Sequence, residues 1–233
     1  MERFINWKDR VLQSWSRIIK YFKNGLENKP SSSRQSANHR SRKTLKDILI
    51  RTYHSLVLPD GESKFGEYVI SKNTFFPERI IGADFCVVKQ IDGGILILFG
   101  DAAGHGIVDA LTAIICMTVF NATTSEDPKE ILHKINKVLW ITKDQAYCVC
   151  IRIQNDEIFY CGRIDEAVLS NRPFDMNCSV LGASEIYECE SKVAKFEDDD
   201  ILRLRTDGAL YSDDSDDQLE VIIRKEGTIA KSL

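Results

Sequence analysis

From residue 65 onward the chain alternates short β-prone segments with turn-forming residues, and this pattern restricts its fold more than any other feature. The connections at 92–94 and 154–156 are short enough to close hairpins, so much of the sheet is expected to be antiparallel. The expected strands are Phe65–Ser71, Asp84–Gln90, Ile95–Phe99, Ala146–Ile153, Glu157–Cys161, Ala167–Leu169, Glu185–Glu190, Ile201–Arg205 and Leu219–Arg224.

Two helices are expected to interrupt the strands. Ile107–Asn121 is apolar almost all round, which predicts a buried helix, whereas Pro128–Trp140 carries its apolar residues on one side. An antiparallel sheet system with helices packed on its faces predicts a layered α+β domain.

The first 50 residues differ from the rest in composition. Apolar residues recur with a helical period over Arg3–Lys23, and lysine and arginine fall between them. Two interpretations of this helix stay open: it docks on its own domain or on a dimer partner, or it lies on an anionic membrane surface. Residues 28–43 are rich in serine and basic residues, without an apolar period, which is typical of a flexible linker. We therefore expect an amphipathic basic helix at 1–27, a linker at 28–43 and a folded domain at 44–233, opening with a helix over Thr44–Leu58.

Charge and hydropathy exclude several classes of protein. Residues 1–50 hold 12 Lys and Arg against 4 Asp and Glu, while the remainder holds 19 against 31, and an acidic body argues against a nucleic-acid-binding core. The longest uncharged apolar run, Ile95–Phe99, is far shorter than the roughly 20 residues that cross a bilayer. The seven cysteines are an odd number without a CxxC pair suited to zinc, and we expect reduced core thiols in a cytoplasmic protein.

Three aspartates stand at strand ends or in tight glycine turns. Asp84 lies in Ile-Gly-Ala-Asp-Phe, Asp101 in Gly-Asp-Ala-Ala-Gly-His-Gly, and Asp207 in Arg-Thr-Asp-Gly. Each motif alone is typical of a turn. Together they place carboxylates at the ends of strands, next to glycines that let carbonyls and waters approach, and Mg²⁺ and Mn²⁺ prefer such oxygen ligands.

These motifs also carry a family resemblance. Asp84, the loop 100–106 followed by an apolar helix, and the strand ending in Thr206-Asp207-Gly208 resemble the three successive signatures of the SpoIIE/RsbU-type branch of the PP2C metal-dependent serine/threonine phosphatases. The resemblance spans roughly residues 44–224. It implies an αββα sandwich, in which two stacked antiparallel sheets are flanked by helices and two Mn²⁺ or Mg²⁺ ions lie at one end.

The resemblance also implies roles for individual residues. Asp101 would bridge both ions, the carbonyl of Ala102 would complete one of them, Asp84 would hold one directly or through water, and Asp207 would bind the other. Two cations would neutralise the phosphate and lower the pKa of a bridging water for in-line attack on phosphorus. In the same loop, His105 either shapes the backbone or serves as an acid toward the leaving group.

The C-terminal region is shorter than the family pattern. Only residues 209–215 separate Gly208 from Asp216, where relatives carry a helical segment. Asp216 best matches the last metal ligand of the family, because it stands before the terminal apolar strand. The neighbouring acidic residues compete with it, and a solvated acidic turn is the other interpretation; these neighbours are Asp213, Asp214 and Asp217.

A further departure from the family lies at 158–171, where Arg163 replaces part of a small turn. Arg163 either binds the substrate phosphate through its planar guanidinium or forms a surface ion pair with Asp165 or Glu166.

The resemblance implies a cytoplasmic phosphatase that removes phosphate from phosphoserine or phosphothreonine of a regulatory protein. The implied substrate is a STAS-type anti-anti-sigma factor of bacterial partner switching. The alternative is a catalytically impaired, phosphatase-like binding module. The helix at 1–27 would mediate dimerisation or contact with a membrane surface, and no nucleic-acid partner is expected.

Overall fold

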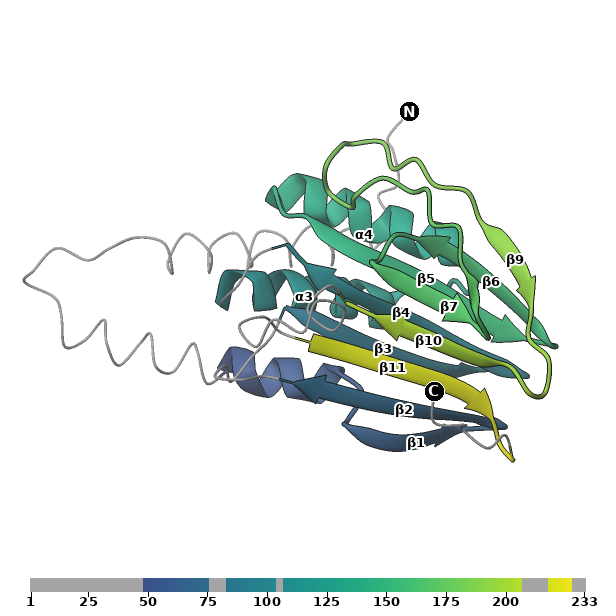
Figure 1. The fold of residues 1–233 in the computed structure, drawn as a ribbon. Coiled ribbons are helices and arrows are strands. Elements are labelled where there is room, and N and C mark those ends of the chain that lie inside the picture. The colour runs from purple at the N-terminus through teal and green to yellow at the C-terminus, as the bar shows by residue number, and fades with distance from the viewer. Residues whose placement is uncertain (1–47, 76–82, 104–106, 207–217, 228–233) are drawn as a thin grey trace, which may run out of the picture.

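The computed structural model describes residues 48–75, 83–103, 107–206 and 218–227. Two antiparallel sheets stack face to face in this part of the chain, and helices cover one of them (Figure 1). The predicted α+β class and the two stacked antiparallel sheets are thereby confirmed. Within the described ranges, no helix is long and apolar enough to cross a membrane.

The six-stranded sheet is antiparallel throughout and has the order β1-β2-β11-β10-β7-β8. Its strands are β1 Gly61–Phe65, β2 Tyr68–Phe75, β7 Glu166–Leu169, β8 Arg172–Pro173, β10 Ile201–Arg205 and β11 Gln218–Lys225.

The five-stranded sheet is also antiparallel, in the order β3-β4-β5-β6-β9. Its strands are β3 Asp84–Ile91, β4 Gly94–Ala102, β5 Ala146–Gln154, β6 Glu157–Gly162 and β9 Lys192–Lys195. The expected hairpins at 92–94 and 154–156 connect β3 to β4 and β5 to β6.

Helices α3 (Ile107–Ala122) and α4 (Pro128–Thr142) pack on the five-stranded sheet, α3 against β3 and β4 and α4 against β5 and β6. Residues 48–56 form a further helical segment, and its buried Leu49 and Tyr53 belong to the same core cluster. Helix α4 begins as expected, because the side chain of Asp127 accepts a hydrogen bond of 3.0 Å from Lys129 N next to a proline at the first helical position.

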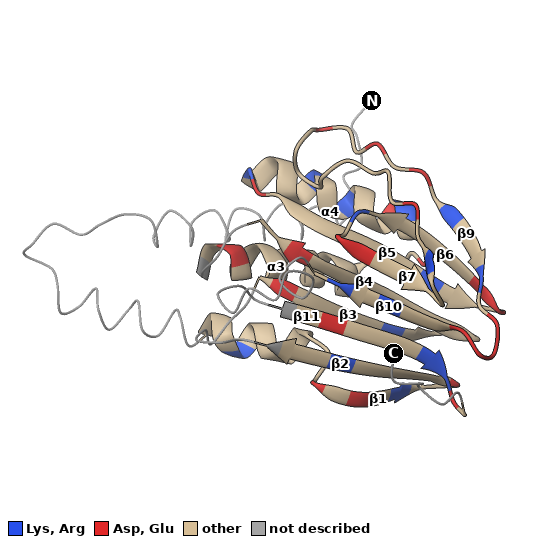
Figure 2. Ribbon diagram, viewed as in Figure 1, with Lys and Arg blue, Asp and Glu red and all other residues tan. Residues whose placement is uncertain are grey.

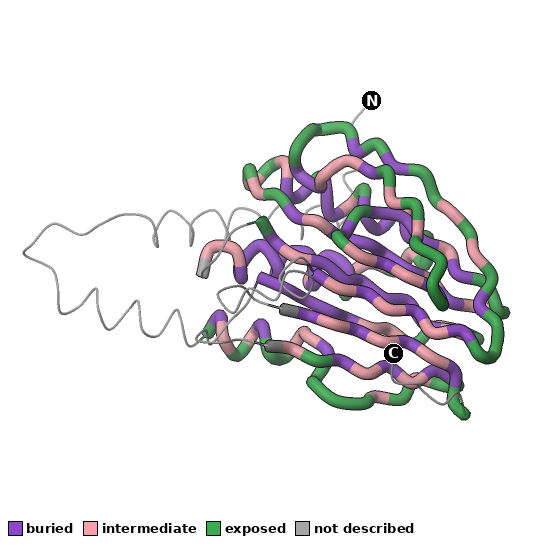
Figure 3. Tube along the Cα trace, in the orientation of Figure 1, coloured by how far each residue is buried: buried purple, intermediate pink, exposed green. Residues whose placement is uncertain are grey.

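Strand alternation divides the core into two clusters. Ile97 and Phe99 of β4 face the six-stranded sheet, whereas Leu96 and Leu98 face the helices. Figure 3 shows buried residues along the central strands and exposed ones concentrated in the connecting loops. Because both faces of the five-stranded sheet are covered, its central strands are apolar almost without interruption.

The outer face of the six-stranded sheet is polar. Arg205 pairs with Glu220 at 2.8 Å and with Glu166 at 3.3 Å, and Arg224 pairs with Glu62 at 3.0 Å. Figure 2 shows basic and acidic residues interspersed along these strands. One face of an antiparallel sheet can remain in contact with water, so this outer face needs no helix to cover it. The described helices that reach the core pack on the five-stranded sheet.

Three sequence-based predictions need correction. The single strand expected at Phe65–Ser71 is a hairpin, because Gly66 adopts a positive φ of 60° and turns the chain between β1 and β2. The strand expected at Glu185–Glu190 is absent, although Tyr187 and Cys189 are buried in alternation. The Glu185 carbonyl accepts from the Asn136 side chain, and the Glu188 carbonyl accepts from Ser179 N, which belongs to no strand.

The third correction concerns the thiols. Five of the seven cysteines are free and buried, as predicted, but Cys178 and Cys189 form a disulfide. The predicted helix at 1–27 and linker at 28–43 lie outside the described residues.

Candidate functional site

Asp84 and Asp101 meet at one end of the sandwich. Asp84 opens β3, Asp101 is the penultimate residue of β4, and the two are directly opposite in the antiparallel register. Residues paired in this way carry Cβ atoms about 4.5–5.5 Å apart on the same face of a sheet. Because Cys86 and Phe99 of the same strands lie in the cluster between the sheets, the alternation places both aspartates on that inner face.

Thr206 ties Asp84 to the opposite sheet. Its Oγ1 donates to Asp84 Oδ2 at 2.9 Å and accepts from Leu219 N at 3.0 Å, while Thr206 N donates to Leu219 O at 3.1 Å. Thr206 and Asp84 are only 1% and 3% exposed. A buried carboxylate is expensive unless hydrogen bonds stabilise it, so the Thr206 hydroxyl helps to fix the orientation of Asp84. Thr206 also immediately precedes Asp207 in the sequence.

The backbone around Asp84 is held by the helical segment 48–56 and by β4. The Tyr53 hydroxyl donates a hydrogen bond to the backbone carbonyl of Asp84, and Leu58 N donates to Cys86 O at 2.8 Å. Ala102 N donates to Ala83 O at 3.3 Å on the other side. The start of β3 is therefore fixed by two different elements.

Gly100 allows the close strand packing that precedes Asp101. A Cβ atom at this position would lie 2.3 Å from Tyr147 O and 2.8 Å from Cys148 Sγ, on neighbouring β5. Only glycine fits without displacing the backbone of β5. This explains physically why a glycine comes directly before the aspartate of the loop.

Tyr147 extends the row of polar residues across the sheet. It is the cross-strand partner of Asp101 on β5 and therefore shares the face of Asp84 and Asp101. The guanidinium of exposed Arg163 lies 5.9 Å from the centre of the Tyr147 ring. This contact favours neither interpretation of Arg163 over the other, but it places a cation beside the residue opposite Asp101.

The donor set suits hard divalent cations. Asp84 and Asp101 supply carboxylate oxygens, the Ala102 carbonyl follows directly in the chain, and like charges opposite one another repel unless positive charge lies near them. The neighbouring thiol adds no negative charge, because burial raises the pKa of Cys86 to about 12 although Lys72 nearby opposes the shift. These residues therefore fit Mg²⁺ or Mn²⁺ better than a soft cation.

The other predicted ligands, Asp207 and Asp216, lie outside the described residues. So do the competing Asp213, Asp214 and Asp217, and the loop residues Gly104 and His105, which were not predicted as ligands. Thr206, Tyr147 and Tyr53 were not predicted to take part in the site. Thr206 belongs to the Thr-Asp-Gly signature itself, so its position beside Asp207 was a usable signal, whereas the other two contacts depend on the register and on helix docking.

The fold is that of the PP2C-like serine/threonine phosphatases. The SiaA PP2C domain of Pseudomonas aeruginosa is similar with a TM-score of 0.62 and 15% identity, over 79% of this chain and 98% of that one. RsbX in complex with magnesium gives a TM-score of 0.60 and 14% identity, over 71% and 98%. The RsbU and RsbW domains of Rv1364c from Mycobacterium tuberculosis give a TM-score of 0.57 and 15% identity, over 70% of this chain and 61% of that one.

Sequence comparison identifies the family within this class. The family described as Stage II sporulation protein E (SpoIIE) matches residues 91–231, which include Asp101, Asp207 and Asp216. The chain therefore belongs to the SpoIIE family of PP2C-like serine/threonine phosphatases, as the three signatures predicted. No curated protein matches its sequence.

Proposed function

We propose that this protein hydrolyses phosphoserine or phosphothreonine on a regulatory protein in a reaction that requires Mn²⁺ or Mg²⁺. One observation carries the proposal: Asp84 and Asp101 face each other on the inner side of the sandwich, and Thr206 donates a hydrogen bond to Asp84 from the opposite sheet. A structural role alone gives no reason to pair two carboxylates at a strand end.

In this proposal two ions are held by carboxylate and carbonyl oxygens. The ligands are Asp84, Asp101, the Ala102 carbonyl, Asp207 and Asp216. The bound cations would neutralise phosphate charge and activate water as the nucleophile. Thr206 fixes the direction of the Asp84 carboxylate, and Tyr53 fixes its backbone. Arg163, beside Tyr147, is the proposed contact for the substrate phosphate, because its planar guanidinium can bind two phosphate oxygens at once.

The proposed substrate is a serine-phosphorylated STAS-type regulator of bacterial partner switching. Membership of the SpoIIE family supports this choice, as does the structural similarity to a protein that combines RsbU and RsbW domains. Such a partner is itself a folded domain, so the enzyme needs an accessible site near its surface. Arg163, exposed at the edge of the candidate site, meets that requirement.

We further propose that the N-terminal region regulates the site. The proposed units are the basic helix at 1–27, the linker at 28–43 and the phosphatase domain at 44–233. Tyr53, within the predicted helix Thr44–Leu58, contacts the backbone of Asp84, so a shift of this helix would move a proposed metal ligand. Replacing Val11, Trp15 and Ile18 together with aspartate tests the idea. Unchanged oligomeric state, vesicle binding and activity would eliminate it.

Hydrolysis assays test the proposed activity. Release of phosphate from p-nitrophenyl phosphate and from a serine-phosphorylated STAS protein is measured with and without Mn²⁺ for the wild type, Asp101→Asn and Asp207→Asn. Asp92→Asn is the matched control, because Asp92 is an exposed aspartate at the opposite end of the β3–β4 hairpin. We expect Mn²⁺-dependent release that both site variants abolish and the control retains.

The alternative interpretation predicts a different result. An impaired regulatory module would release no phosphate from either substrate in any variant. Calorimetry with Mn²⁺ would then show whether a metal site survives, because a cation that binds only the native state must raise its apparent stability. Hydrolysis of p-nitrophenyl phosphate without hydrolysis of the STAS protein would support the enzyme and reject the proposed substrate.

A further inference from the structure

A long irregular segment connects β8 to β9. Residues 174–191 form no strand apart from the isolated bridge between Leu181 and Ala146. Segments longer than about 12–15 residues without secondary structure are uncommon inside compact domains and need other interactions to hold them. This segment is held at one point by Asn136 of α4, whose Oδ1 accepts from Gly182 N at 2.7 Å.

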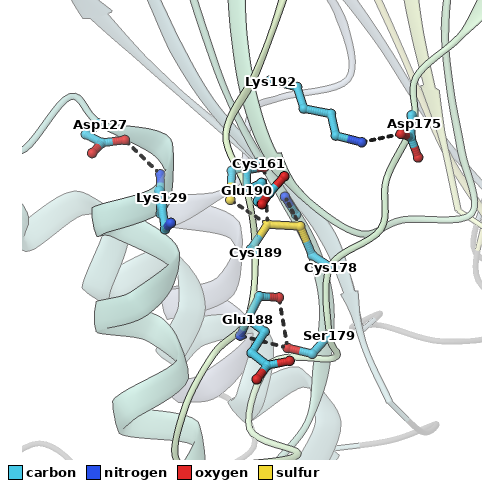
Figure 4. Close-up of a disulfide and its surroundings, with 11 residues drawn as sticks. Asp127, Lys129, Cys161, Asp175, Cys178, Ser179, Glu188, Cys189, Glu190 and Lys192 are labelled. Carbon is cyan, nitrogen blue, oxygen red and sulfur yellow. Dashed lines mark hydrogen bonds and ion pairs between the residues drawn. A yellow bond between two sulfur atoms is a disulfide. The ribbon is translucent and has the colours of Figure 1, made fainter.

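The second attachment point is a cluster of three sulfur atoms. Cys178 and Cys189 of the irregular segment meet Cys161 of β6, and their Sγ atoms all lie within 4.8 Å of one another (Figure 4). Cys161 is 1% exposed, and the other two are 7% exposed. Cys178 and Cys189 form a disulfide, and Cys161 Sγ lies 2.6 Å from Cys189 Sγ. We call these three residues the Cys cluster.

The Cys cluster contains one sulfur atom more than a disulfide requires. A disulfide between Cys178 and Cys189 would join two parts of the irregular segment without a third thiol, yet Cys161 brings the cluster onto β6. Gly162 N donates to Cys178 Sγ at 3.3 Å, a contact that favours a sulfur atom carrying negative charge. Three converging sulfur ligands with a backbone N–H donor are typical of a site for a thiophilic cation.

Thiol–disulfide exchange within the cluster is a weaker explanation. The attacking group in such an exchange is a thiolate. Cys161 is only 1% exposed, and such an exchange also depends on access to the sulfur atoms. A metal ion, in contrast, displaces the proton from a coordinating thiol.

We propose that Cys161, Cys178 and Cys189 of the reduced protein bind one thiophilic divalent cation of the Zn²⁺ class, and that the disulfide is the oxidised, metal-free form of the same site. Tetrahedral Zn²⁺ with sulfur ligands at about 2.3 Å sets sulfur–sulfur distances of about 3.8 Å. In the disulfide form Cys161 Sγ lies only 2.6 Å from Cys189 Sγ, so reduction must let the three sulfur atoms move apart before the cation binds. Three protein ligands leave the fourth position to water.

The two forms interconvert through a balanced reaction. Two molecules of a small thiol reduce the Cys178–Cys189 disulfide, and they leave as one small-molecule disulfide while the protein gains two thiols. One Zn²⁺ ion then displaces three protons from the three thiols. Zinc binding should therefore require a reducing environment and release protons.

The site would fasten the irregular segment beside the candidate phosphatase site. Leu181 pairs with Ala146, and Ala146 is the cross-strand partner of Ala102, which follows Asp101. Fixing the segment to β6 would hold this edge of β5 in place. The proposed zinc site is nevertheless chemically separate from the aspartates, because soft thiolates select other cations than carboxylates do.

Cobalt binding tests the proposal in the full-length protein. The Asp101→Asn variant is used as the background, so that the carboxylate site contributes little. It is reduced with a phosphine, titrated with Co²⁺ under anaerobic conditions and then with Zn²⁺. We expect one Co²⁺ per chain with a near-ultraviolet thiolate charge-transfer band that Zn²⁺ removes, and no such band in the oxidised protein.

Single substitutions assign the ligands. Cys161→Ala should weaken the band and reduce Zn²⁺ affinity by more than the roughly 10- to 100-fold that loss of an outer partner of a metal ligand costs. Cys116→Ala is the matched control, since Cys116 is an equally buried thiol outside the cluster, and it should retain the band. Alkylation followed by mass spectrometry should show that Zn²⁺ protects the three cluster thiols.

Three results would overturn the proposal, and the first and third of them need no cysteine substitution. They are a reduced protein without a thiolate band, a band that Cys161→Ala leaves unchanged, and a Cys178–Cys189 pair that stays disulfide-bonded under strong reduction. Each is independent of phosphatase activity, so failure here leaves the proposed function untouched.

Discussion

Replacing Thr206 with valine removes the hydroxyl that links the two sheets at the candidate site while keeping the side-chain shape. The variant loses the hydrogen bond to the Asp84 carboxylate, at 2.9 Å, and leaves Leu219 N without its hydroxyl acceptor, at 3.0 Å. A hydrogen bond to a charged group contributes about 1.5–3 kcal/mol, and an unsatisfied buried donor costs about 1–3 kcal/mol. Because the two losses share one hydroxyl, we expect a total of about 3 kcal/mol.

This loss is measurable by thermal unfolding. In a chain of this size about 1 kcal/mol corresponds to roughly 2–4 °C, so Thr206→Val should lower the Tm of the metal-free protein by roughly 6–12 °C. It should also weaken Mn²⁺ binding by about 10- to 100-fold, because Asp84, a proposed metal ligand, loses the group that orients it. Calorimetric titration with Mn²⁺ at a temperature where the variant stays folded measures this second effect.

Two controls separate the hydroxyl from the change in side chain. Thr206→Ser retains the hydroxyl and should keep most of the Mn²⁺ affinity. Thr142→Val removes a hydroxyl that bonds only to carbonyls of its own helix, at 3.2 and 3.3 Å, and should leave Mn²⁺ affinity unchanged. Wild-type Tm and wild-type Mn²⁺ affinity in Thr206→Val would falsify the inference that Thr206 orients Asp84.

Further outcomes follow from the same structure. Asp101→Asn removes a like charge opposite Asp84, so it should raise the free energy of unfolding of the metal-free protein by about 0.2–1 kcal/mol. It should also abolish stabilisation by Mn²⁺. A lower free energy of unfolding of the metal-free variant in urea would contradict the first expectation. Lys89→Met should lower the free energy of unfolding in urea by about 1–2 kcal/mol, because the Lys89 ammonium donates to carbonyls at the C-terminal end of α3. An unchanged urea midpoint would show that water satisfies these carbonyls equally well. Hydrogen bonding from Lys134 lowers the pKa of Glu130, so this pair contributes stability above the ordinary glutamate pKa near 4.3, and the contribution is lost as pH falls through the folded-state pKa. NMR titration of Lys134→Met should show the pKa of Glu130 returning toward its ordinary value, and no movement would mean that the ion pair does not form in solution.

Local sequence signals predicted most of the secondary structure. Turn formers at 92–94 and 154–156 predicted two hairpins, and the apolar patterns located α3 and α4 to within two residues at their ends. The error at Glu185–Glu190 has a non-local origin. The buried alternation of a strand is present there, but the segment begins on a contact between the Glu185 carbonyl and Asn136 of α4, and no local pattern reveals a partner so distant in the chain.

The sequence singles out the aspartates of the candidate site but not the residues that surround them. Glycine-flanked aspartates at strand ends identify Asp84 and Asp101, since the β3–β4 hairpin has a short turn and its register follows from it. Tyr147 is different, because β5 reaches β4 only after two helices, and its register depends on how those helices pack. The cysteines could not be grouped from the sequence either, because their spacing along the chain matches no metal-binding motif. The three sulfur atoms of the Cys cluster meet only because the irregular segment folds back onto β6.

The sequence by itself determined the family, the layered α+β architecture and the acidic residues that suit a divalent cation, because these depend on residue type, periodicity and short turns. Tertiary structure decided which distant groups support them. The hydrogen bond from Thr206 to Asp84 crosses between sheets, the bond from Tyr53 reaches the same aspartate from a helix, and Cys161 meets Cys189 across an irregular segment. Contacts of this kind depend on how separate layers stack, and stacking is set by the packing of the whole core, a cooperative property that no single segment of sequence contains.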